Sequence, residues 1–131
     1  MWEAVGVMRT EAGMERGLRR IAEIKAEMLE TGVNDVNLAF NLTWHDWLNL
    51  ASLVDVSEVI TRAALLRENS RGAHYREDFP EAGDLESSYF TVARQSGEAV
   101  DVQREPVRFT IVRPGETVLP EGEPETLVAQ A

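Results

Sequence analysis

Apolar residues recur at helical spacing through the first half of the chain. Three of them fall three positions apart and predict one or two turns of helix at the start: Trp2, Val5 and Met8. A second helix of about five turns is predicted over 11–31, because Thr10 suits its N-cap and Gly32 its C-cap. The apolar positions of this second helix are Met14, Leu18, Ile21, Met28 and Leu29.

The stretch 41–69 has the strongest helical pattern in the chain, with no Gly or Pro inside it. It fits one long helix or two shorter ones, because the run 55–58, Asp-Val-Ser-Glu, can cap a new helix. Apolar residues cover more than one face, so we expect this element to be the most buried and the most central. Trp44 and Trp47 share a face, which is typical of a core or an interface.

After Pro80 the pattern changes from helical to alternating. Strands are predicted over 90–94 and 100–104, joined by a turn at 95–98 that contains Gly97. The alternation resumes over 107–111, so we expect a hairpin or a three-stranded patch. From 114 to 131 the chain is rich in Glu, Pro and Gly, a composition that predicts a flexible acidic tail.

Composition narrows the classes of function. The 131 residues are 44% apolar, which suits one domain with one core, and we place that domain at 1–113. The net charge of -10 disfavours nucleic acid and anionic membranes as partners, and no Cys is present for disulfides or thiolate chemistry. Residues 1–30 contain no uninterrupted apolar run, so no signal peptide or membrane insertion is expected. We expect a cytoplasmic protein.

The loop 70–80 holds most of the candidate chemistry, because polar and cationic side chains gather where the long helical pattern ends. His74, Glu77 and Asp78 form a short cluster that could ligate a metal through two groups, whereas a complete site needs three or four well-placed ligands. No glycine-rich G-x-G-x-x-G or P-loop motif occurs to hold a pyrophosphate. We therefore predict no catalytic, cofactor-binding or metal-binding residue in this chain.

Arg71 and Arg76 allow two interpretations. Guanidinium groups bind carboxylates, so both residues can contact a dicarboxylate or an acidic neighbouring surface. They can equally bond the free carbonyls at the end of the preceding helix and complement its dipole. Gly72, which lies between them, is expected to supply the positive φ that ends that helix.

Together with the preceding Arg67-Glu68-Asn69, the run 70–80 resembles one known signature. It is similar to the segment that closes the helical C-terminal domain of the flavoprotein subunits of succinate dehydrogenase and fumarate reductase, and of L-aspartate oxidase. The similarity extends from Met1 to Val107 and is most specific over 64–80. Members usually carry Lys and Glu where Glu68 and Asn69 stand here, and a longer acidic run than 83–85 before a Trp. These departures leave the subfamily open.

The resemblance implies a mainly α fold, a spectrin-like three-helix bundle with a small C-terminal β-hairpin, packed against flavin-binding and capping domains. It implies FAD and the catalytic residues in those other domains, and none of them in this chain. The domain would brace a parent FAD-dependent oxidoreductase, with Arg71, Gly72, His74 and Arg76 at the contact. An iron–sulfur subunit would be a further partner, and membrane association would come through partner subunits. The alternative is a free-standing helical adaptor that binds an acidic or apolar partner.

Overall fold

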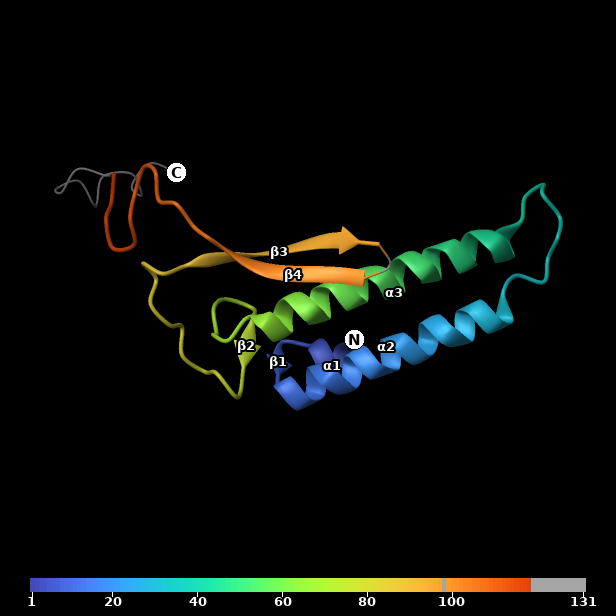
Figure 1. The fold of residues 1–131 in the computed structure, drawn as a ribbon, viewed down its shortest axis with the longest axis horizontal. Coiled ribbons are helices and arrows are strands. Elements are labelled where there is room, and N and C mark those ends of the chain that lie inside the picture. Colours follow the sequence, from blue (N-terminus) through green and yellow to red (C-terminus); the bar gives the residue numbers. More distant parts are fainter. Residues whose placement is uncertain (98, 119–131) are drawn as a thin grey trace, which may run out of the picture.

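A computed structural model of the chain describes residues 1–97 and 99–118. Two long antiparallel helices form its frame: α2 spans Glu11–Thr31 and α3 spans Leu42–Leu66 (Figure 1). A one-turn helix, α1 (Trp2–Val5), lies beside α2, and a two-stranded ribbon lies along α3. The described residues therefore combine helices with a small β element, as the sequence predicted.

Local capping sets the helix ends that the sequence predicted correctly. The Thr10 hydroxyl accepts the Gly13 N–H at 3.1 Å, and Gly32, with φ +59°, donates its N–H to the Met28 carbonyl at 2.9 Å. Asn41 caps α3 by accepting the Trp44 N–H at 2.8 Å. Each bond satisfies a backbone group that a helix end leaves free.

The stretch 41–69 forms one helix and not two, and this answers the question that the sequence left open. Asp55 and Glu58 lie inside α3, where their carboxylates bind Lys25 Nζ of α2 at 2.8 and 2.7 Å. The residues that looked like a cap therefore hold the two long helices together. α3 ends at Leu66, three residues before the predicted limit.

The first predicted helix is shorter than expected. α1 ends at Val5, and Met8 lies in a short strand, β1 (Met8–Arg9), which pairs in parallel with β2 (Tyr75–Arg76). This pairing brings the N-terminus to the loop after α3. Gly17 permits the close approach of α1 to α2, because a β-carbon at that position would lie 3.1 Å from the β-carbon of Ala4.

The predicted hairpin is confirmed. β3 (Tyr89–Ser96) pairs antiparallel with β4 (Ala99–Pro106), and Gly97 in the turn has φ +62°. Within the described chain, 107–111 forms no strand, although the Val107 N–H donates to the Ser88 carbonyl at 2.9 Å. The three-stranded alternative was therefore wrong.

The finer prediction of a spectrin-like three-helix bundle is not confirmed. Residues 1–97 and 99–118 contain two long helices and the single turn of α1. Within the same residues, no helix is both long enough and apolar enough to cross a bilayer. Most of the predicted tail, residues 119–131, lies outside the described part of the chain.

The core of the described chain is small. Its buried apolar residues are Val5, Met14, Ile21, Val54 and Ala64. Three of them meet where α1, the start of α2 and the end of α3 come together: Val5, Met14 and Ala64. α3 is the central element, as expected, because α2, β3 and β4 all pack against it, but a helix that is apolar on several faces cannot cover them all. Trp44 and Leu53 are both more than half exposed.

Candidate functional site

Ser70 organises the loop between α3 and β3. Its hydroxyl accepts the Arg76 N–H and donates to the Phe79 carbonyl, both at 2.8 Å. Its own N–H donates to the Glu81 carbonyl at 2.9 Å. One short polar side chain thus closes the backbone of a ten-residue loop onto itself, which fixes the side chains that the loop carries.

A tight turn lies at the start of this loop. Arg71 and His74 exchange backbone hydrogen bonds of 2.9 and 3.1 Å, and Gly72 between them has φ +57°. The sequence correctly predicted a positive φ at Gly72, but not its role. α3 ends at Leu66 with Arg67 in an extended conformation, so Gly72 forms this turn and does not terminate the helix.

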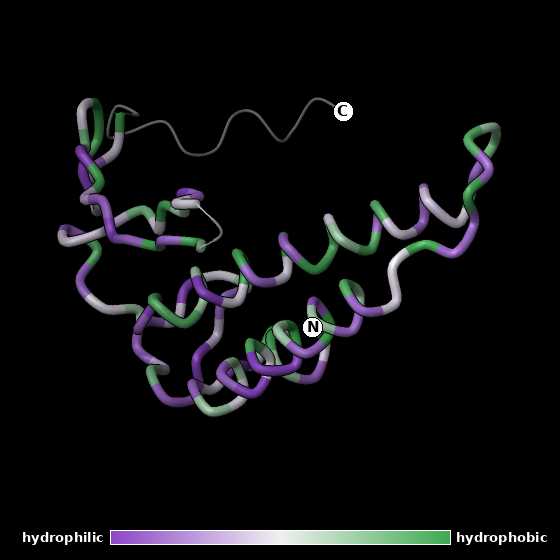
Figure 2. The backbone as a smooth tube through the Cα atoms, turned by 45° about the vertical axis from the view of Figure 1, so that its right-hand side comes forward, coloured by the Kyte–Doolittle hydropathy of each residue, from purple (hydrophilic) through white to green (hydrophobic). Residues whose placement is uncertain are grey.

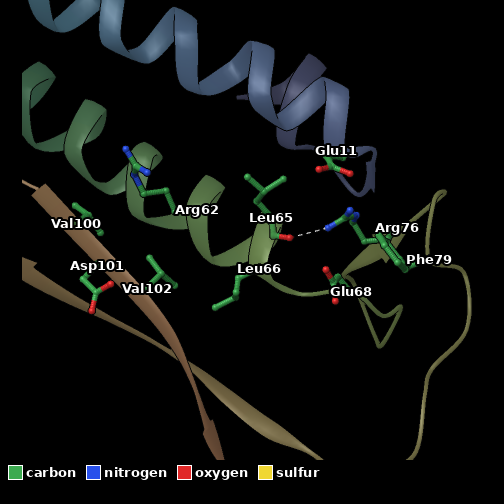
Figure 3. A pocket seen from close by; sticks show the side chains of 10 residues that line it. All are labelled: Glu11, Arg62, Leu65, Leu66, Glu68, Arg76, Phe79, Val100, Asp101 and Val102. Atoms are coloured by element: carbon green, nitrogen blue, oxygen red, sulfur yellow. Dashed lines mark hydrogen bonds between the residues drawn. The ribbon is translucent and has the colours of Figure 1, made fainter.

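Arg76 lies inside the domain, with a relative exposure of 1%. Its Nε and Nη2 donate to the two carboxylate oxygens of Asp78, each at 2.7 Å. Its Nη1 lies 3.0–3.3 Å from the carbonyl oxygens of Ala64, Leu65 and Arg67, and Figure 3 shows the bond to Leu65. The helix-end interpretation therefore describes Arg76, whose charge sits at the negative end of α3.

Asp78 extends this arrangement to the other long helix. Its Oδ2 also accepts the N–H of Glu11, the first residue of α2, at 2.9 Å. The Arg76 guanidinium holds the pKa of the Asp78 carboxyl well below its usual range, and the backbone bond from Glu11 adds to that shift. The carboxylate therefore stays ionised at the positive end of α2, where a negative charge is favourable.

His74 lies between two neighbours that fix its protonation. Its Nδ1 contacts Nη1 of Arg9, and its Nε2 lies 3.2 Å from the Arg67 carbonyl oxygen. Because a guanidinium only donates and a carbonyl only accepts, the ring is neutral with its proton on Nε2. Burial lowers the pKa of His74, and the charges of Arg9, Arg67 and Arg76 lower it further.

The side chains that could have ligated a metal already have partners within the fold. His74 uses both ring nitrogens for Arg9 and Arg67, while Asp78 is held by Arg76 and the start of α2. Across residues 1–97 and 99–118, no three His, Asp or Glu side chains are grouped as metal ligands would be. The polar cluster that the sequence presents is a set of bonds within the fold.

Arg71 turns toward the segment that follows the loop. Its Nε donates to the Ala82 carbonyl at 2.6 Å, its Nη2 to the Asp84 carbonyl at 2.9 Å and its Nη1 to Ser88 Oγ at 2.7 Å. This side chain positions the connection into β3. The fold thus brings Arg71, Gly72, His74 and Arg76 into one loop, in which both arginines bind the chain's own backbone.

Two side chains of this cluster were missed by sequence reasoning. Arg104 of β4 donates to the Leu66 carbonyl at 2.6 Å and to Glu68 at 2.9 Å, and Arg9 of β1 holds His74. Arg104 and Arg76 together bond the last carbonyls of α3, and His74 contacts the carbonyl of Arg67 just after it. Arg104 lies 38 residues from Leu66 and Arg9 lies 65 from His74, so no local spacing could have indicated these bonds.

An open cleft of about 460 Å³ adjoins this cluster, between the end of α3, β4 and the loop (Figure 3). Its ionisable lining residues include Glu11, Glu68 and Asp101, against Arg62 and the buried Arg76. Arg62 binds Glu58 at 2.7 Å and Arg76 is occupied by Asp78. With its cations already paired, the cleft does not suit the phosphates of a dinucleotide.

Comparisons with known proteins identify the family. The family model described as "Fumarate reductase flavoprotein C-term" matches residues 1–119. This chain belongs to that family. Membership confirms the resemblance drawn from the loop signature, and it gives no support to a free-standing adaptor.

Individual relatives agree with this assignment. The fumarate reductase flavoprotein subunit of Haemophilus influenzae is 32% identical, with 90% of this chain and 20% of that protein covered. The L-aspartate oxidase of Yersinia pestis is 42% identical, over 62% of this chain and 14% of that enzyme. The FrdA chain of a variant of E. coli quinol fumarate reductase superposes with a TM-score of 0.80 at 25% identity, over 88% of this chain and 20% of that one.

The lengths differ greatly. The chain spans about a fifth or less of the length of these relatives, and the family model that it matches is that of a C-terminal region. The described residues therefore correspond to the C-terminal domain of a flavoprotein subunit, and not to the whole of one.

Proposed function

We propose that this region is the C-terminal bracing domain of an FAD-dependent oxidoreductase. The parent would act on a dicarboxylate, as a succinate dehydrogenase or fumarate reductase does, or on L-aspartate. FAD and the residues that react with substrate would lie in the flavin-binding and capping domains, and this domain would hold those domains in place without catalysing. An iron–sulfur subunit is a further proposed partner. The parent is proposed to be cytoplasmic, with any membrane association made through such subunits.

The observation that carries the proposal is the exposed apolar surface beside a small core. An apolar groove of about 770 Å³ runs between α1, α2 and α3, lined by residues that include Trp2, Ile24, Leu50 and Leu53. Trp2 is 85% exposed and Leu53 is 64% exposed. Contiguous apolar surface of this kind is typical of a face that another protein surface covers.

The groove also supports the finer fold proposal. A third helix, contributed by the parent protein, would fill the groove and complete a spectrin-like three-helix bundle with α2 and α3. The bundle with its hairpin would occupy 1–113, and 114–131 would be a flexible acidic tail.

The turn at Arg71–His74 is the second proposed contact with the parent domains. Gly72 is exposed at its apex, and Arg71 and His74 are half-buried beside it. In this arrangement Arg76 supports the turn from within, because its guanidinium already binds Asp78 and α3. The outer edges of Arg71 and His74, with the Gly72 backbone, would face the neighbouring domain.

Deletion tests the bracing role directly. The full-length flavoprotein without residues 1–131 should lose bound FAD on gel filtration and unfold at a lower temperature than the intact protein. The 131-residue chain mixed with FAD should elute without a flavin absorbance band, because it has no strand–glycine turn–helix to bind the pyrophosphate. A deletion protein that keeps its FAD and its Tm would refute the bracing role. A flavin absorbance band that elutes with the 131-residue chain would refute the proposal that FAD binds only to the other domains.

A further inference from the structure

Exposed apolar side chains gather at the end of the helical hairpin farthest from the loop cluster. We call residues 33–44, which join α2 to α3 and include the first turn of α3, the hairpin tip. Figure 2 shows hydrophobic stretches at this tip. Val36 is 88% exposed, Leu38 and Phe40 are completely exposed, and Leu42 and Trp44 are mostly exposed. Water is an unfavourable environment for so many neighbouring apolar groups, which indicates a covered surface in the working protein.

The hairpin tip is held in one conformation by its own polar residues. The Asp35 carboxylate accepts the Asn37 N–H at 2.9 Å, and the Asn37 side chain accepts the Ala39 N–H at 3.0 Å. The Asn41 amide donates to the carbonyls of Asp35 and Asn37, both at 2.8 Å. Phe40 has φ +56°, a conformation that residues with a β-carbon rarely adopt. A rigid apolar projection loses little entropy when it docks.

The charge around the hairpin tip is of one sign. No Lys or Arg occurs between Lys25 and Arg62. Glu30 and Asp46 are exposed beside the tip, and Asp35 lies within it. A complementary surface must therefore combine an apolar cavity with cationic side chains at its rim. A second copy of this chain would bring like charge against like charge, so self-association through the tip is disfavoured.

The position of the groove indicates which polypeptide carries that surface. In the relatives, about four-fifths of the protein lies outside the matched C-terminal region. Met1 and Trp2 line the apolar groove together with Leu53. Leu42 precedes Leu53 by eleven residues, close to three helical turns, so both lie on one face of α3. The groove and the tip thus lie on one face of α3, with the exposed carboxylate of Asp46 between their apolar residues.

We propose that the hairpin tip inserts into an apolar cavity, rimmed by Lys and Arg, on the flavin-binding and capping part of the parent flavoprotein. This inference rests on the proposed function and adds a defined contact to it. The groove and the tip would then contact the same neighbouring domains at two places along α3, which would fix the orientation of the helical hairpin relative to them.

Cysteine labelling tests the insertion, because the chain has no Cys of its own. Leu38→Cys and, as a milder second variant, Ala39→Cys are made in the 131-residue chain and in the full-length flavoprotein. The rate of maleimide addition at that cysteine is measured by mass spectrometry and divided by the rate in urea. We expect labelling in the full-length protein to be slower by at least about tenfold, since access requires the contact to open. Equal rates in chain and flavoprotein would overturn the proposal.

Further variants and conditions of the labelling experiment identify which surface covers the tip. Glu30→Lys with Asp46→Lys should speed labelling of the full-length protein toward the rate of the chain, whereas Glu86→Lys, an exposed charge elsewhere, should not. No effect of the double reversal would overturn the cationic rim. Slow labelling only when other subunits are present would place the cavity on a subunit. Protection of the isolated chain that grows with its concentration would mean self-association. Either result would refute this proposal, and both are independent of whether deletion releases FAD.

Discussion

Arg76 and Asp78 form a two-bond ion pair, with both N–O distances at 2.7 Å, that connects the two long helices through their opposite ends. Arg76 reaches the last carbonyls of α3, and Asp78 accepts the first N–H of α2. Each charge therefore lies at the helix end whose partial charge it complements. Since the pair also adjoins the small core of Val5, Met14 and Ala64, we expect it to contribute strongly to stability.

Replacing Arg76 by lysine tests this pair. Lysine keeps the positive charge but cannot bond both oxygens of Asp78 and the α3 carbonyls together. We expect Arg76→Lys to lower the free energy of unfolding by about 3 kcal/mol, near the range for breaking a buried pair. Urea denaturation followed by circular dichroism would measure it. Arg108→Lys, at an exposed arginine, is the matched control and should change little. A similar loss in both variants would contradict the role given to Arg76.

The pH dependence of stability should reveal the protonation of His74. Its pKa is lowered in the folded chain, chiefly by burial, so the unfolded chain binds a proton more readily. The stability that comes from neutral His74 is complete above its ordinary pKa of about 6.5, and is lost as the pH falls below that value toward the folded pKa.

His74→Gln removes this titration while keeping a donor and an acceptor at the site. The free energy of unfolding of the unsubstituted chain should fall between pH 7 and pH 5.5, and that of His74→Gln should fall less. Urea melts at several pH values would compare the two slopes. Identical slopes would show that protonation of His74 does not oppose folding.

Gly72 should be replaceable only at a cost in backbone strain. Its φ of +57° is disfavoured for residues with a β-carbon, while no atom lies close enough to exclude a side chain sterically. We expect Gly72→Ala to cost about 1 kcal/mol, and Gly72→Asn less, because Asn tolerates this region better. The midpoints of urea denaturation would rank the three proteins. A more stable alanine variant would mean that the turn adjusts without strain.

Features set by neighbouring residues could be predicted from the sequence, and features set by distant ones could not. The limits of α2 follow from Thr10 and Gly32, which bond within their own helix. The end of α3 was predicted three residues late, because its carbonyls are satisfied by Arg76 and Arg104 from elsewhere in the chain. Many apolar residues of 41–69 are exposed for a related reason. An apolar pattern shows which residues avoid water, but not which polypeptide covers them.

Leu53 offers the sharpest test of whether another part of the flavoprotein covers the exposed apolar surface. It lines the apolar groove and is 64% exposed in this chain, so Leu53→Gln should change the stability of the isolated chain by no more than about 0.5 kcal/mol. In the full-length flavoprotein the same side chain would be buried against the parent domains, where an unpaired amide is costly. We therefore expect Leu53→Gln to lower the Tm of the flavoprotein and to weaken FAD retention. Ile111→Gln, at an 86% exposed position outside the groove, serves as the control in both proteins. Equal and small effects of Leu53→Gln in chain and flavoprotein would mean that the groove stays open to water, and the bracing surface would have to be sought on another face.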